Sequence, residues 1–166
     1  MSASSFIHNA TTGIIALMSK IPDSLVNLSL RLGLAGIFWV SARTKVTDFL
    51  TISDNTYFLF EEEYQLPFFS VDFLVPLATY AEHILPLLLL FGFATRFAAL
   101  GLFFMTLVIQ IFVYPDAFLS THLGWMALSL AIISKGPGSL SLDHLIAQRQ
   151  SGQQAKDQPQ GASLKA

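Results

Sequence analysis

The chain contains no cysteine and few charged side chains. The missing cysteines exclude disulfides, thiolate metal ligands and dithiol chemistry within this chain. Charged residues make up 12% of the 166 residues, against about 25% in an ordinary soluble domain. The formal net charge of −2 provides no excess of basic residues, so we do not expect a nucleic-acid partner. A single domain with little room for a large soluble core is predicted.

Long apolar segments take the place of those charges. Because backbone groups in lipid must pair within their own segment, each segment is expected to be a helix. Each approaches the roughly 20 residues needed to cross about 30 Å of hydrocarbon. The segments predict an all-α, four-helix transmembrane bundle, and they cover residues 22–42, 71–93, 97–114 and 117–134.

The regions outside this membrane domain, which we place at residues 22–147, are predicted to differ from it. Residues 1–21 lack the positive start and long apolar run of a secretory signal, so an interfacial amphipathic segment is expected. A short amphipathic helix is predicted from Ser141, with its apolar side on the membrane. Residues 148–166 are rich in Gln, Ser, Gly and Lys and are predicted to be a disordered cytoplasmic tail.

The distribution of basic residues predicts the orientation of the chain. Four spans place both termini on one side, with six Lys and Arg residues, whereas only Arg43 and Lys45 lie on the other side. The positive-inside rule then places both termini in the cytoplasm of a multi-pass inner-membrane protein. The connection 43–70 faces outward and mixes acids with aromatics. It is interpreted as an interfacial loop that caps the bundle or, alternatively, as an ordinary aromatic belt.

Glu82 and His83 lie in the middle of the second apolar segment. An ionised carboxylate at this depth costs roughly 2.5–3.5 kcal/mol on insertion scales. It therefore needs a partner, a water-filled cavity or a proton. Arg31 reaches a similar depth from the first segment, since each helical residue rises about 1.5 Å. An Arg31–Glu82 ion pair is predicted, which either holds the helices together or serves a ligand or a proton.

Other polar residues recur at helical spacing and predict stripes turned toward the bundle interior. Those of the third and fourth segments fall in the outer half of the membrane, which predicts a polar site opening toward the outer face. The candidate ligand-binding residues are Glu82, His83, Gln110, Tyr114, His122 and Trp125. Interhelical hydrogen bonding alone is the alternative reading of the same residues.

Metal and catalytic motifs are missing. His83 and His122 could ligate a haem or metal from two helices, but a single histidine on a helix is more often a hydrogen-bonded interior residue. Neither a Glu-x-x-His nor a His-x-x-x-His spacing supports a metal site, and none is predicted. Without a Ser–His–Asp constellation or a phosphate-binding glycine loop, no catalytic residue is assigned.

Six segments follow one another in a particular order along the chain. They are Arg-x-x-Leu-Ala-Gly-Ile-Phe (31–38), Phe-Glu-Glu-Glu-Tyr-Gln-Leu-Pro (60–67), Ala-Glu-His-Ile-Leu-Pro (81–86), Gly-Phe-Ala-Thr-Arg-Phe-Ala-Ala-Leu (92–100), Val-Ile-Gln-Ile-Phe-Val-Tyr-Pro-Asp (108–116) and Gly-Pro-Gly-Ser-Leu-Ser-Leu-Asp (136–143). In this order they resemble the DoxX family of small four-helix membrane proteins, and the resemblance covers most of residues 28–145.

The resemblance implies a membrane location and a link to redox chemistry. The family name comes from a relative of a membrane subunit of an archaeal thiosulfate:quinone oxidoreductase, and other members resemble partners in membrane redox or oxidative-stress assemblies. It supplies no catalytic residues and no thiosulfate activity for this chain.

The leading hypothesis is a subunit of a membrane redox complex without catalytic activity of its own. It would hold a quinone through aromatic walls and a few hydrogen-bonding groups. It would act beside a partner protein in the bilayer, as a subunit of an oxidoreductase. One alternative is a small transporter or proton-conducting protein that uses Glu82 and His83. Another is a scaffold or assembly factor without a small-molecule site.

Overall fold

A computed structural model describes residues 3–67 and 69–157, and these residues contain helices but no strand. Four helices are long and apolar enough to cross a membrane, which confirms the predicted all-α, four-helix transmembrane bundle. They are Asp23–Thr44, Val71–Phe91, Thr95–Val113 and Pro115–Lys135.

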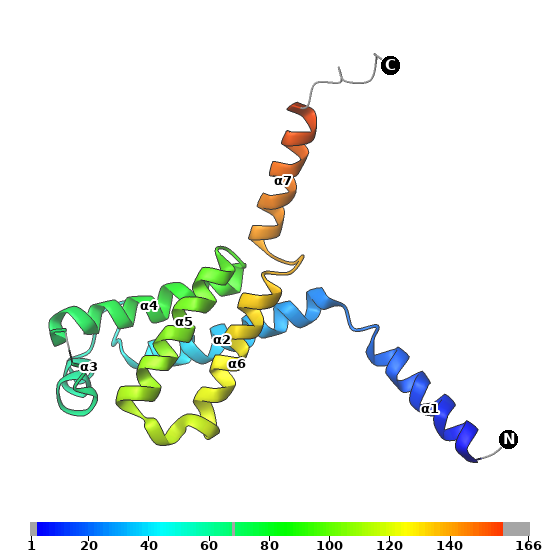
Figure 1. The fold of residues 1–166 in the computed structure, drawn as a ribbon. Coiled ribbons are helices and arrows are strands. Elements are labelled where there is room, and N and C mark those ends of the chain that lie inside the picture. Colours follow the sequence, from blue (N-terminus) through cyan, green and yellow to red (C-terminus); the bar gives the residue numbers. More distant parts are fainter. Residues whose placement is uncertain (1–2, 68, 158–166) are drawn as a thin grey trace.

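The helices pack mainly as two antiparallel pairs (Figure 1). Helix α2 (Asp23–Thr44) packs against α4 (Val71–Phe91), and α5 (Thr95–Val108) packs against α6 (Leu123–Lys135). We call the end where α2 leads into the long connection the loop end. The opposite end, where α4 turns into α5 and where α1 and α7 join the bundle, is the terminal end.

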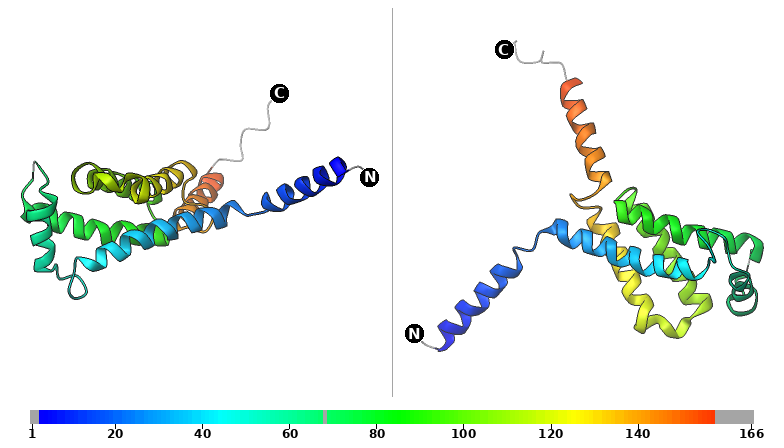
Figure 2. Two further views of the ribbon diagram at one scale, coloured as in Figure 1. Left: turned by 90° about the horizontal axis from the view of Figure 1, so that it is seen from below. Right: turned by 180° about the vertical axis from the view of Figure 1, so that it is seen from behind.

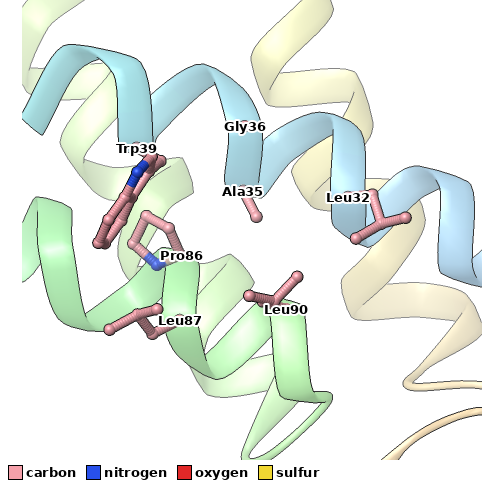
Figure 3. Close-up of a pocket in the computed structure, with 7 residues that line it drawn as sticks. All are labelled: Leu32, Ala35, Gly36, Trp39, Pro86, Leu87 and Leu90. Carbon is pink, nitrogen blue, oxygen red and sulfur yellow. The ribbon is translucent and has the colours of Figure 1, made fainter. Parts of the chain in front are cut away.

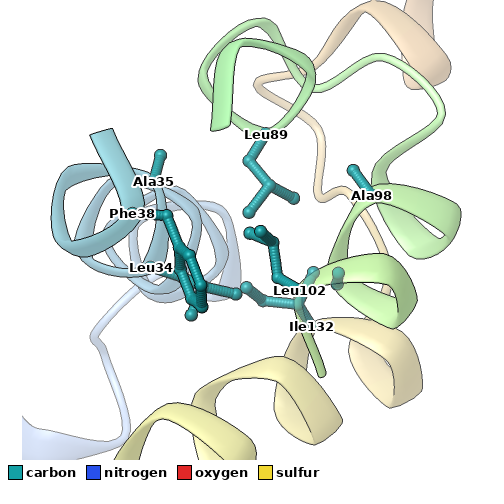
Figure 4. Packing of buried hydrophobic residues seen from close by; sticks show 8 residues of the cluster. Leu34, Ala35, Phe38, Leu89, Ala98, Leu102 and Ile132 are labelled. Carbon is teal, nitrogen blue, oxygen red and sulfur yellow. The ribbon is translucent and has the colours of Figure 1, made fainter. Parts of the chain in front are cut away.

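Side chains from all four spanning helices meet in one apolar core (Figure 4). Phe38 from α2, Leu89 from α4, Leu102 from α5 and Ile132 from α6 are at most 1% exposed. Lipid is as apolar as these side chains, so van der Waals packing rather than water exclusion holds them together. The small Ala98 of α5 belongs to the same cluster, where its size permits close helix packing.

A network of polar contacts fixes the terminal end. Gly92 ends α4 with φ of +67°, and a Cβ at this position would lie 1.9 Å from Nη1 of Arg31. The guanidinium of Arg31 donates to the carbonyl oxygens of Leu89 and Leu140. Asp143 adds a link, because its carboxylate accepts hydrogen bonds from the first backbone N–H groups around the start of α5.

Helices α1 (Ala3–Met18) and α7 (Leu142–Asp157) extend away from the bundle (Figures 1 and 2). The disordered tail predicted from residue 148 is wrong up to Asp157, because α7 continues through this segment. Gln, Ala, Arg and Lys are good helix formers, and they outweigh the polar composition on which the prediction rested. The remainder of the predicted tail, residues 158–166, lies outside the described residues.

Short helices fold the predicted outer loop into a cap over the loop end. Helix α3 (Asp54–Leu59) is capped by the preceding Ser53, whose side chain accepts a hydrogen bond from the N–H of Thr56. A π-helical turn, η1 (Phe60–Tyr64), follows directly and buries Phe60. The third and fourth spans also depart from α-helical geometry here. The turns η2 (Ile109–Val113) and η4 (Phe118–His122) are π-helical, and the 3₁₀ turn η3 (Pro115–Ala117) lies between them.

Candidate functional site: the cavity at the loop end

A cavity of about 170 Å³ lies within the bundle at the loop end. Its walls come from α2, α4, α5 and α6 and from the π-helical turns of the cap and of the third and fourth spans. We call it the loop-end cavity, and its lining includes Ser41, Lys45, Phe60, Tyr64, Glu82, Met105, Val113, Tyr114, His122 and Trp125.

An ion pair forms the most polar part of this lining. Nζ of Lys45 lies 2.7 Å from Oε2 of Glu82, and the side chains are 13% and 4% exposed. The same ammonium donates to Oγ of Ser41 at 3.2 Å. An ammonium carries three N–H donors, so one remains for another acceptor. Glu82 therefore has the partner that its position among apolar residues requires.

The predicted Arg31–Glu82 pair is wrong, because the helices pack in a different register. Arg31 lies level with Leu89, which is about two helical turns, or about 10 Å, beyond Glu82 along α4. Its guanidinium bonds to backbone carbonyls at the terminal end instead. Lys45 takes its place beside Glu82 from the opposite end of α2.

Gln110 fixes the protonation pattern of His122. Nε2 of Gln110 donates to the carbonyl oxygen of Pro115 at 2.7 Å, which leaves its Oε1 to face Nδ1 of His122, also at 2.7 Å. An amide oxygen only accepts hydrogen bonds, so Nδ1 must carry the proton. In the neutral imidazole, Nε2 then keeps a lone pair that can accept a hydrogen bond from a ligand.

Aromatic rings form much of the remaining wall. Trp125 packs beside His122 with ring centroids 5.2 Å apart, and Tyr64 meets Tyr114 edge to face at 6.1 Å. Burial raises the pKa of the Tyr64 phenol above its ordinary value, and the neighbouring Tyr114 phenol raises it further. The Tyr64 phenol is therefore a neutral hydrogen-bond donor at physiological pH. A flat ring between such walls would be held by stacking and edge contacts.

The structure brings together most, but not all, of the predicted site residues. The loop-end cavity is lined by Glu82, Tyr114, His122 and Trp125. Gln110 does not line it but accepts a hydrogen bond from His122. His83 does not belong to this group. It lines a different pocket beside Trp39, at a ring-centroid distance of 5.5 Å, because adjacent residues on a helix point about 100° apart.

Lys45 and Tyr64 are among the lining residues that sequence reasoning missed. Lys45 follows Phe38 and Ala42 at helical spacing on the buried face of α2, a signal hidden by the assignment of residue 43 onward to a loop. Tyr64 carried no such signal, since only the folded cap brings η1 against the bundle. Among residues 3–67 and 69–157, no group of three or more His, Asp or Glu residues is placed to hold a metal ion.

The fold and this interior define a small four-span integral membrane protein with a largely apolar cavity that contains a buried ion pair. A sequence model of the DoxX family matches residues 26–115, more than half of the chain. The chain therefore belongs to the DoxX family. No curated protein and no solved structure gives a significant match.

Proposed function

We propose that this protein is a non-catalytic membrane subunit that holds the ring of a quinone in its loop-end cavity for a membrane redox assembly. The observation that carries the proposal is the combination of aromatic walls with directed polar groups in one cavity. Its volume of about 170 Å³ is below the roughly 300–1,000 Å³ of drug-sized pockets. This size favours a single ring or a comparably small group.

The polar groups match both redox states of such a ring. A quinone oxygen accepts hydrogen bonds, and Lys45 has an unused N–H while Tyr64 offers a phenol. A quinol hydroxyl donates, and Nε2 of His122 is available as the acceptor. The chain would supply binding and orientation, whereas electron transfer would be the chemistry of the quinone and of a partner protein.

The proton-conducting alternative receives less support from this geometry. It needs Glu82 and His83 to act in one pathway, but these neighbours line different pockets. The scaffold alternative makes no demand on the cavity. It becomes the better account if the purified protein carries no quinone and loses none of its partners when the cavity is altered.

The experiment compares the two histidines. Protein purified in mild detergent under anaerobic, reducing conditions should contain quinone in its quinol form, detectable by mass spectrometry. His122→Leu should lower this quinone content per folded molecule about fivefold, because Nε2 of His122 can accept a hydrogen bond from the quinol but not from the oxidised ring. This corresponds to one hydrogen bond of about 1 kcal/mol. The matched control is His83→Leu, which removes a buried imidazole from α4 without touching the cavity.

The two variants also decide against the proposal if it is wrong. Two results would contradict a site in the loop-end cavity. One is a parent protein that contains no quinone, and the other is an equally lowered quinone content in both variants. Thermal melts of the same samples ensure that quinone is counted per folded molecule. Native mass spectrometry of the same purification would identify the redox partner.

A further inference from the structure

A second binding surface lies on the outside of the bundle, between α2 and α4. An apolar pocket of about 390 Å³ is bordered by Leu32, Gly36, Trp39, Pro86 and Leu90 (Figure 3). A second pocket, of about 180 Å³, continues from it toward the loop end and shares Trp39 and Leu87 with it. We call the two together the α2–α4 groove.

The groove runs along the helices and changes in character from one end to the other. From Leu32 to Trp39 it follows α2 for about two turns, or about 10 Å, between aliphatic side chains. At the loop end it reaches Arg43, Tyr80 and His83. Helices that cross the bilayer lie roughly parallel to its hydrocarbon chains, so this direction suits a chain with its head at the loop end.

Arg43 places a positive charge at that head-group end. Its Nη1 and Nη2 donate to the carbonyl oxygens of Phe49 and Asp48, at 2.8 and 3.0 Å, and so hold the loop against the pocket. A guanidinium carries five N–H donors, and the two bonds leave others for an anion. The side chain is exposed, as contact with a lipid phosphate would require.

His83 adds a buried hydrogen-bond acceptor without a partner. Its Nδ1 donates to the carbonyl oxygen of Thr79 at 2.7 Å, so Nε2 of the neutral ring carries the lone pair. His83 is only 4% exposed, and its buried Nε2 has no hydrogen-bond partner among the described residues. Leaving such an atom unpaired costs about 1–3 kcal/mol, which a ligand hydroxyl inserted beside Trp39 would recover.

We propose that the α2–α4 groove binds one anionic phospholipid whose head group carries hydroxyls, of the phosphatidylglycerol type. One acyl chain would lie between Leu32 and Leu90, the phosphate would face Arg43, and a glycerol hydroxyl would donate to Nε2 of His83. A quinone fits this end less well, because its carbonyl oxygens cannot donate to an acceptor nitrogen. The site is separate from the loop-end cavity and does not depend on the function proposed for that cavity.

Two glycines of α2 provide a test that spares the fold. Gly36 borders the groove, Gly33 does not, and a Cβ at either position would meet no atom within 4 Å. Gly36→Leu should therefore fill the groove, while Gly33→Leu makes the same substitution on another part of the helix surface. In native mass spectrometry with added phosphatidylglycerol, Gly36→Leu should lower the bound fraction at least fivefold, and Gly33→Leu should leave it unchanged.

The head-group assignment is tested with His83→Phe and two lipids of equal chain length. This variant should weaken phosphatidylglycerol binding about fivefold, the equivalent of one hydrogen bond. Phosphatidylcholine, which has no hydroxyl, should bind equally to parent and variant. Equal losses of both lipids would show a packing role for His83 and overturn its assignment, as would a parent protein without a preference for phosphatidylglycerol.

The remaining outcomes are equally decisive. Lipid retention by Gly36→Leu would overturn the groove site, and quinol bound in a His83-dependent way would replace the phospholipid as its occupant. The result for the cavity stays distinguishable, because His122→Leu tests quinone content whereas Gly36→Leu tests lipid binding. Loss of both ligands from a variant whose thermal melt matches that of the parent would contradict the independence of the two sites.

Discussion

Lys45 follows the last residue of α2, and its side chain turns back along the helix into the bundle. A lysine at a helix end in a membrane usually extends its ammonium toward water. Here the ammonium lies between Ser41 and Glu82 instead. The attraction of a carboxylate in a poorly solvated interior therefore outweighs the hydration that the surface would provide.

Breaking this pair should destabilise the protein more than removing it. Lys45→Met leaves the Glu82 carboxylate buried and unpaired, and we expect a loss of about 3–5 kcal/mol in the free energy of unfolding. The double variant Lys45→Met, Glu82→Leu should recover much of that loss. Unfolding in detergent with increasing denaturant would compare four proteins: the parent, Lys45→Met, Glu82→Leu and the double variant.

A second double-mutant cycle serves as the control. Arg31→Met and Glu82→Leu should have additive effects, because Arg31 bonds to carbonyls at the terminal end rather than to Glu82. Coupling between Arg31 and Glu82, together with additivity between Lys45 and Glu82, would contradict the pairing of Lys45 with Glu82.

The sequence predicted individual site residues better than their partners. Helical spacing is a property of one segment, and it correctly turned Glu82, His122 and Trp125 toward the interior. The pairing of Arg31 required the relative shift of two helices, which depends on how Leu34 and Phe38 pack against Leu89. No pattern within a single segment contains that information, so estimates of depth alone chose the wrong cation.

Between helices, the joint of α4, α5 and α7 shows how a distant residue can begin a helix. Oδ1 and Oδ2 of Asp143 accept hydrogen bonds from the N–H groups of Ala94 and Thr95, at 2.8 and 2.9 Å. The N–H of Asp143 donates in turn to the carbonyl oxygen of Gly92 at 2.9 Å. The carboxylate thus caps α5, and its negative charge also interacts favourably with the positive end of the helix dipole.

Removal of this cap should loosen the terminal end. Asp143→Ala should cost about 1–2 kcal/mol of stability, the usual range for the loss of a helix N-cap. Hydrogen exchange should rise at the start of α5 and in α7. Asp72→Ala is the matched control, since this exposed carboxylate lies in the first turn of α4. Equal effects of the two variants on stability would contradict a capping role for Asp143.

The segments that resembled the DoxX family are explained in part by this joint. Residues 92–100 and 136–143 contain its glycines, the capped helix start and the capping aspartate. They are thus signals of fold rather than of ligand chemistry. The sequence could not show this, because the bonds join residues about fifty positions apart along the chain. The existence of the four spans needed only local apolarity, and it was predicted correctly.

Considered as a whole, the molecule has a terminal end joined by a network of polar contacts and a capped loop end that contains a cavity. More basic residues lie at the terminal end or in the helix that extends from it than at the loop end: Lys20, Arg96, Lys135 and Arg149, against Arg43 and Lys45. We therefore infer that the terminal end faces the cytoplasm and that the loop-end cavity lies toward the opposite side of the membrane.

Reporter fusions would test this orientation. A reporter joined after Gln150 should be active only in its cytoplasmic form, and one inserted after Asn55 should be active only in its exported form. Labelling of introduced cysteines with an impermeant reagent provides an independent check, because the parent chain has none. An exported carboxyl terminus would reverse the orientation and place the cavity near the cytoplasm.

Three π-helical turns lie around the loop end, at residues 60–64, 109–113 and 118–122. Each closes its hydrogen bond over one residue more than an α-helical turn. Deleting one residue there would restore an ordinary helix and rotate the rest of that helix by about 100°. The width of the loop-end cavity is thus determined partly by the number of residues in each turn of its walls. Relatives of this chain would accordingly acquire loop-end cavities of different sizes through insertions and deletions of one residue, while the terminal end stays unchanged.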